Sequence, residues 1–307
     1  MKKRHLLAGI ALCALCALPA LGAPAQTDLA GRAAGFDLFV SSDADHSNVV
    51  KAGLTLDYAY ADLEHYQGVR LESFRFSARG APSTTQTRGY FNFADSGARW
   101  KWNGTIGTDG HNVLGSASIY VDENFRQEYS LSRDLLETPK GIARGIYSTF
   151  VAASYDMPLD DANTITGLVG VQDFAGANKR IHLRARYIYA LQPEWGLSAQ
   201  LRTRSSWNSV PRELDYFSPR WYFEAIPTLQ LRRFYQRWQY SVALGWGLRK
   251  DSGTGWQGAA LANMSVISPA IGRDWHLKAE FVYSNMPVSA GYTYNYEQGT
   301  LSLIKSF

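Results

Sequence analysis

Cysteine is nearly absent from this chain, and that absence is the first constraint on its fold. Only 2 of the 307 residues are cysteines, and both, Cys13 and Cys16, lie close to the N-terminus. The remainder of the chain must therefore be stabilised by burial and hydrogen bonding rather than by disulfides. No spacing of His, Cys and Asp suggests a metal site, and no Gly-Lys-Ser/Thr phosphate loop occurs. The sequence thus predicts no metal and no cofactor.

A dominant charge of one sign and long hydrophobic runs are also missing. The chain has 31 Lys and Arg against 27 Asp and Glu, a formal charge of +4, with 19% charged residues in all. This near balance excludes the strong basic field of a nucleic-acid-binding protein and the composition of a disordered tail. After residue 25 no apolar stretch reaches the ~18 residues of a membrane-spanning helix. We expect no helical membrane anchor.

The N-terminal segment has the pattern of an export signal. Basic residues at 2–4 precede an apolar run at 6–18, and Ala23-Pro24-Ala25 fits a small-x-small cleavage site. We therefore expect a signal peptide at 1–25 and a short N-terminal segment at 26–34. Leucine precedes each cysteine, which argues against a lipoprotein.

Apolar and polar residues alternate along the rest of the chain. In 180–191, Ile181, Leu183 and Tyr187 fall on one face and three arginines fall on the other. The same period of two recurs in 54–60, 238–248 and 275–283. A period of two places successive side chains on opposite faces of a β-strand. Turn residues such as those at 80–82 and 251–253 separate the segments, so strands are predicted throughout 35–307.

Abundant aromatic residues favour an outer-membrane barrel over a soluble barrel or sandwich. The chain has 18 Tyr, 14 Phe and 9 Trp, and tryptophans flank the apolar segments at Trp195, Trp207, Trp221, Trp238 and Trp275. Such rings prefer the lipid–water interface and form girdles at both rims of membrane barrels. With spans of roughly 9–11 residues, 35–307 accommodates about 16 strands, with 14 to 18 possible. The predicted fold is an all-β, transmembrane antiparallel β-barrel in the Gram-negative outer membrane, with the bilayer as a partner.

A cluster of basic residues occupies the predicted lumen face. Its members lie on two successive strands, and they are Arg180, Arg184, Arg186, Arg202 and Arg204; Arg232 and Arg249 could extend it. Guanidinium groups donate several fixed hydrogen bonds, so this cluster could contact anionic or hydroxyl-rich solutes. Alternatively, these arginines pair with lumen Asp and Glu and make the barrel rigid. Both interpretations remain open at this point.

Catalytic arrangements are weak in this sequence. His111 and Ser116 faintly resemble the His and Ser of outer-membrane phospholipases, but Asp109-Gly110 is typical of a hairpin turn. Asp160-Asp161 is the one loop-borne acidic pair that could serve a protease, but a solvated turn after Pro158 explains it better. We predict no catalytic residue and no enzymatic activity, and a hydrolase acting on lipid or glycan at the rim stays an alternative. A general porin would use a constriction loop, for which 205–220 is the candidate.

Three short segments resemble a known family of barrels. They are 133–142 (Arg-Asp-Leu-Leu-Glu-Thr-Pro, then Gly-Ile), 176–187 (Gly-Ala-Asn-Lys-Arg, then Arg-Ala-Arg-Tyr) and 215–223 (Asp-Tyr-Phe-Ser-Pro, then Trp-Tyr-Phe). Together they resemble the C-terminal barrels of exopolysaccharide exporters, namely the poly-N-acetylglucosamine exporter and the cellulose synthase outer-membrane subunit. Those exporters carry periplasmic tetratricopeptide repeats, for which 26–34 is too short.

The resemblance implies a passive conduit in exopolysaccharide secretion. A polysaccharide would be the substrate, and periplasmic scaffold or synthase subunits would be partners. A general diffusion porin or a structural barrel with a closed lumen is the alternative.

Overall fold

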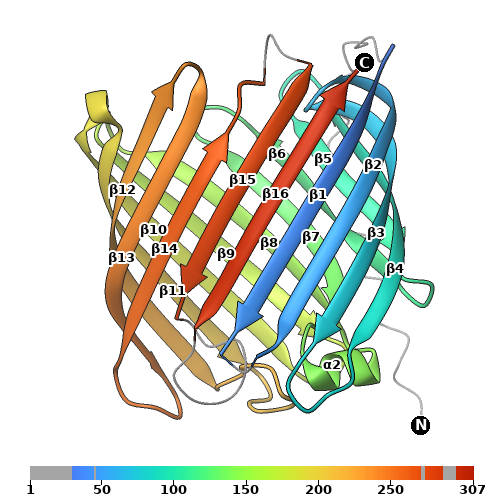
Figure 1. Ribbon diagram of the computed structural model, residues 1–307. Coiled ribbons are helices and arrows are strands. Elements are labelled where there is room, and N and C mark those ends of the chain that lie inside the picture. The colour runs from blue at the N-terminus through green and yellow to red at the C-terminus, as the bar shows by residue number, and fades with distance from the viewer. Residues whose placement is uncertain (1–29, 45, 271–273, 286–294) are drawn as a thin grey trace.

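The structure is a computed structural model that describes residues 30–44, 46–270, 274–285 and 295–307. Over these residues the chain forms sixteen antiparallel strands that close into one barrel (Figure 1), which confirms the predicted fold class. The expected signal peptide at 1–25 lies outside the described residues. The first strand begins at Gly31, four residues before the expected start at 35.

The strands follow one another around the barrel in chain order. The first eight are β1 (Gly31–Asp43), β2 (Asn48–Asp62), β3 (His65–Ser77), β4 (Thr84–Ser96), β5 (Lys101–Thr108), β6 (Val113–Val121), β7 (Gln127–Leu135) and β8 (Tyr147–Pro158). The others are β9 (Asn163–Phe174), β10 (Lys179–Gln192), β11 (Leu197–Asn208), β12 (Trp221–Tyr235), β13 (Trp238–Asp251), β14 (Gln257–Ile267), β15 (Trp275–Ser284) and β16 (Tyr296–Ser306). A helix, α2 (Pro139–Arg144), and a 3-10 turn, η1 (Pro193–Trp195), lie between strands.

Pairing of the first and last strands closes the sheet. β1 and β16 are antiparallel partners from Ala33↔Ser306 to Asp43↔Tyr296, and they lie side by side in Figure 1. Closure leaves no strand edge, so the backbone groups of each strand find partners on both sides. In the part of the chain that the structure describes, no helix is long and apolar enough to span a membrane.

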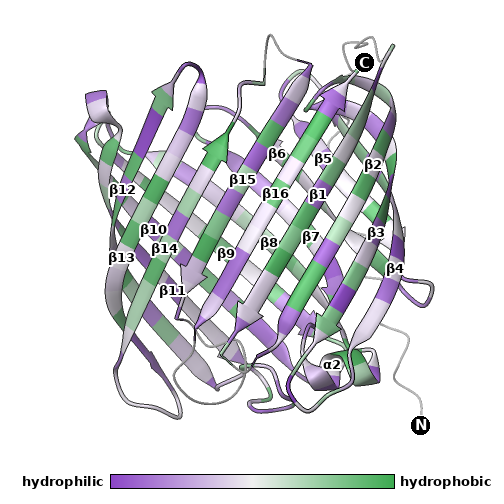
Figure 2. Ribbon diagram, in the orientation of Figure 1, coloured by the Kyte–Doolittle hydropathy of each residue, from purple (hydrophilic) through white to green (hydrophobic). Residues whose placement is uncertain are grey.

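Hydropathy alternates along the strands and separates the two faces of the sheet. Figure 2 shows hydrophobic and hydrophilic residues in succession along individual strands. Large apolar side chains point outward and are exposed, as Leu54 is at 65% and Leu183 at 57%. A soluble protein would bury such side chains, whereas a membrane barrel presents them to lipid. Polar residues of the opposite phase therefore line the interior.

The two ends of the barrel differ in the length of their connections. At the end that holds the C-terminus, β2 and β3 are joined by residues 63–64, and β12 and β13 by 236–237. At the other end, β7 and β8 are joined by 136–146 and β11 and β12 by 209–220. Outer-membrane barrels have short periplasmic turns and longer extracellular loops. We therefore call these the turn side and the loop side, and assign the loop side to the exterior.

Tryptophans mark both rims, as the sequence predicts. On the turn side, Trp238 and Trp275 begin their strands, with ring centroids 5.9 Å apart. On the loop side, Trp207 and Trp221 are directly paired across β11 and β12. Amphipathic rings at these heights fix the barrel at the two lipid–water interfaces.

Candidate functional site in the barrel lumen

The basic residues predicted to face the lumen do so. The three on β10 occupy alternate positions, and cross-strand register places Arg184 opposite Arg204 and Arg186 opposite Arg202. Together these four line a cavity of about 850 Å³ inside the barrel. Arg180 lies nearer the loop side and lines a second cavity of about 500 Å³.

The five arginines differ in how they are paired. Arg204 forms an ion pair with Glu224 at 2.8 Å. Arg202 donates to the side-chain oxygens of Gln200 and Gln230, at 3.0 and 3.3 Å. Arg184 and Arg186 differ from these two. Among the described residues, neither has a hydrogen-bonded or ion-paired side-chain partner, and both are exposed to the lumen.

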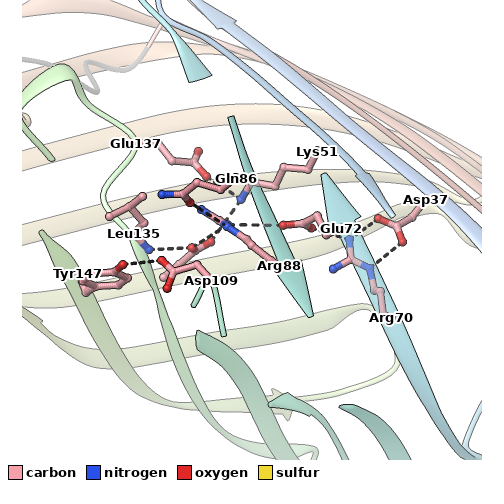
Figure 3. Close-up of polar contacts among 11 residues, drawn as sticks. Asp37, Lys51, Arg70, Glu72, Gln86, Arg88, Asp109, Leu135, Glu137 and Tyr147 are labelled. Atoms are coloured by element: carbon pink, nitrogen blue, oxygen red, sulfur yellow. Dashed lines mark hydrogen bonds and ion pairs between the residues drawn. The ribbon is translucent and has the colours of Figure 1, made fainter. Parts of the chain in front are cut away.

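A second group of charged residues lines the lumen on β1–β4 and β7, and its members form ion pairs with one another (Figure 3). Arg70 bonds both oxygens of Asp37, at 2.8 and 2.5 Å, and Glu72 at 2.6 Å. Arg88 has no exposed surface and reaches Asp134 at 3.2 Å. We call this group, completed by Lys51 and Glu137, the ionic wall.

Long-range contacts hold the ionic wall together. Lys51 reaches Glu137 at 2.6 Å and Asp134 at 3.3 Å, and the Arg88 guanidinium lies 3.9 Å from the Phe74 ring centroid. Burial raises the pKa of Glu137, and the neighbouring Lys51 ammonium opposes that rise. The ionic wall was not predicted from the sequence. Its signal in the sequence was the inward phase of the charged residues on β1–β4.

The three segments that resemble exporter barrels meet at the loop-side opening. α2 begins after Thr138, whose hydroxyl accepts from the Gly141 N–H as the N-cap. Asp215, in 209–220, accepts from the Thr138 hydroxyl and from the Lys140 N–H, both at 2.7 Å. The two loops are thereby joined. We call 136–146, 175–180 and 209–220 together the mouth assembly.

A buried polar group fixes the rest of the mouth assembly. Asn178 has no exposed surface and donates to Asn208 at 3.0 Å and to the Tyr216 hydroxyl at 2.8 Å. Tyr216 donates to Glu213 at 3.0 Å, and Glu213 also accepts from backbone N–H groups of 175–180. Burial, opposed by the bond from Asn178 and reinforced by Glu213, raises the pKa of Tyr216, so its hydroxyl stays neutral.

Arg180 faces the lumen at its loop-side end, where its guanidinium is bound within the mouth assembly. It donates to Asn208 at 2.9 Å and to the Phe217 carbonyl. Its guanidinium also lies over the rings of Phe174 and Tyr216, which stack 4.2 Å apart. The candidate constriction loop thus starts at 209 instead of 205, because β11 continues through Asn208, and it folds against the barrel wall.

Packing of α2 also narrows the opening from the other side. Ile142 contacts two small apolar clusters inside the barrel end, one around Phe74 and Phe76 and one around Leu114 and Tyr147. These contacts draw the 136–146 loop inward. The loops 136–146 and 209–220 therefore meet at the loop-side opening, and the arginine-lined cavity lies farther toward the turn side.

The catalytic candidates stand apart from these features. His111 lies in an exposed turn in which Asp109 accepts from the His111 and Asn112 N–H groups, both at 2.9 Å. Within the described residues His111 makes no hydrogen bond to Ser116, whose hydroxyl lies 3.4 Å from Thr105. Asp160 caps a turn-side hairpin. The described residues contain no group of three or more His, Cys, Asp or Glu that could hold a metal ion.

Comparison with known proteins supports the fold without giving a family. No protein-family model matches, and no curated protein matches. Among solved structures, a "Bacterial polysaccharide outer membrane secretin" matches with a TM-score of 0.64 and 11% identity, over 89% of this chain and 98% of that chain. OprD of Pseudomonas aeruginosa matches with a TM-score of 0.45 and 8% identity, over 93% of this chain and 99% of that chain.

The chain has the fold of an outer-membrane β-barrel. The similarity to the secretin confirms, for the fold, the resemblance to exporter barrels that the segments 133–142, 176–187 and 215–223 indicate. The barrel encloses a polar lumen with one basic region, one ionic wall and the mouth assembly at its loop-side end.

Proposed function

We propose that this barrel is a passive conduit through which a secreted polysaccharide crosses the outer membrane. The observation that carries the proposal is a continuous row of polar side chains on the β10–β12 side of the lumen. From the turn side toward the mouth assembly it includes Arg232, Gln230, Gln200, Arg202 and Arg186. The five lumen arginines predicted from sequence are the proposed substrate contacts.

Such a row suits a moving glycan chain. Amide and guanidinium groups hydrogen-bond sugar hydroxyls, and many weak sites allow a chain both to enter and to leave. In this proposal synthesis at the inner membrane supplies the driving force. Scaffold or synthase subunits in the periplasm deliver the chain to the turn side. The polysaccharide named for the structurally similar secretin supports this choice of cargo.

A general diffusion porin is the second candidate. The 850 Å³ cavity carries acidic as well as basic side chains, among them Glu128 and Asp156. A lumen lined by both signs suits small polar solutes in general.

Single-channel recording separates the two candidates. The refolded barrel is inserted into planar bilayers, and six-unit and longer oligosaccharides are added at the turn side. If the barrel is a conduit, glycans block its current steps. The blocked time should increase with glycan length, since a longer chain contacts more of the row of polar side chains. Open steps that no glycan affects would overturn the proposal in favour of the porin. Heat-modifiable migration on gels verifies that each sample is folded.

A further inference from the structure

In the cavity of about 850 Å³, the charges that a solute can reach are mostly positive. Two of its arginines are neutralised, because Arg204 pairs with Glu224 and Arg126 pairs with Glu128. Among the described residues, the basic side chains of this lining that form no ion pair with an acid are Arg184, Arg186, Arg202 and Arg232. The acid remaining in the cavity lining is Asp156.

Strand register brings these positive charges together. Arg186 lies directly opposite Arg202, whereas Arg184 lies opposite Arg204, whose charge is offset by Glu224. Like charges in directly opposed positions destabilise a β-sheet. Asp156 lies in the same row as Arg186, but Thr166 of β9 separates them. The fold thus holds a locally unfavourable arrangement that a bound anion would relieve.

The arginines form a ladder along the barrel axis. Arg184 and Arg186 are two residues apart on β10, which corresponds to a rise of about 7 Å. Arg232 lies farther toward the turn side, near the end of β12. Arg180, at the mouth assembly, has its guanidinium engaged by protein groups. A polysaccharide that carries regularly repeated anions could thus meet guanidinium groups that form no ion pair over the middle of its path through the lumen.

We propose that the cargo of this conduit is an acidic polysaccharide that bears carboxylate groups. This inference rests on the proposed function and specifies its substrate class. The planar guanidinium fork matches the geometry of a carboxylate, which it can bind through two parallel hydrogen bonds. Several exposed sites in sequence attract the chain, and water in the lumen keeps each contact weak enough for release.

The test compares two six-unit probes of equal length in planar bilayers. One is hexagalacturonate, and the other is its fully methyl-esterified and therefore neutral form. We expect the acidic hexamer to block the channel at a concentration at least about tenfold lower, since each near-surface charge pair contributes a several-fold effect. Raising the salt concentration should reduce that preference by screening.

Two variants assign the effect to the ladder. R184Q/R186Q/R202Q/R232Q removes the positive charges but keeps long polar side chains. Both hexamers should block this variant at the same concentration. The control R75Q/K179Q/K250Q removes positive charges from the outer face of the barrel near the loop side, and it should keep the preference. Heat-modifiable migration confirms that both variants fold.

The outcomes distinguish the two proposals. If neither hexamer nor longer glycans block the wild-type channel, the conduit itself is refuted. If both hexamers block the wild type equally, the conduit stands and the acidic cargo is refuted. A preference for the acidic hexamer that survives in the lumen variant refutes the assignment to these four arginines.

Discussion

Truncation of one buried asparagine should release the mouth assembly. Asn178 has no exposed surface, and its amide nitrogen donates to Asn208 at 3.0 Å and Tyr216 at 2.8 Å. Its carbonyl oxygen accepts from the Val210 N–H at 3.1 Å and the Ser209 hydroxyl at 3.5 Å. Asn178→Ala removes these bonds and leaves several buried groups without partners.

The size of the effect follows from this contact set. Each net hydrogen bond contributes about 1 kcal/mol, and unmet buried partners add to the loss. Allowing for the weak 3.5 Å contact, the docked state of 209–220 should lose about 3–4 kcal/mol. That loss lowers the ratio of docked to released loop by about 10²–10³. The strands, held by their own ladders, should remain paired.

Two measurements detect the release. Trypsin added to the loop side should cleave after Arg212 or Arg220 much faster in Asn178→Ala than in the wild type, because a docked loop is a poor protease substrate. Single-channel recordings should show larger and noisier current steps. The control Asn48→Ala removes one exposed loop-side amide, which bonds the His46 carbonyl at 3.1 Å, and should change neither readout. Unchanged cleavage and conductance in a folded Asn178→Ala barrel would refute this account of the mouth.

Two further predictions concern stability. Arg88→Met breaks a fully buried ion-paired group and should lower the free energy of unfolding by about 3–5 kcal/mol, measured by urea unfolding from bilayers. The control Arg75→Met, on the outer face, should change that free energy by less than about 0.5 kcal/mol. Equal effects of the two substitutions would contradict the ionic wall. Burial alone would raise the pKa of Asp109, but bonds from Tyr147 and from backbone N–H groups outweigh it and lower that pKa. The stabilisation by Asp109 is therefore complete above its unfolded pKa of about 4 and is lost as the pH falls through the folded value. Asp109→Asn should flatten the stability profile below about pH 4, and a profile with the wild-type slope would show that other groups cause it.

The strand pattern could be predicted from local sequence because its cause is local. Side chains two residues apart share a face, so Ile181 and Leu183 had to face the same way, and Arg184 the other. Tryptophans at strand ends indicated a bilayer as the surrounding medium, and this fixed which face was outside. Fold class, approximate strand number and the inward direction of the five arginines followed from these two facts.

Pairing within the lumen could not be predicted in the same way. Arg88 and Asp134 are 46 positions apart, and Lys51 and Asp134 are 83 apart. The alternation of apolar and polar residues predicts that such side chains point inward. It predicts neither their position along the barrel axis nor their neighbours across the lumen. The sequence therefore left open whether Arg184 and Arg204 were both paired. The structure shows that Glu224 binds one of them.

The mouth assembly shows the same division most clearly. The sequence by itself determined that turns or loops separate the strands. It also contained the three segments that resemble exporter barrels, 133–142, 176–187 and 215–223. Only the tertiary structure decided that Thr138, Asn178 and Asp215 belong to one assembly. The physical reason is that strand alternation is set by bonds between adjacent residues, whereas these contacts exist only after closure of the barrel brings distant loops to the same end.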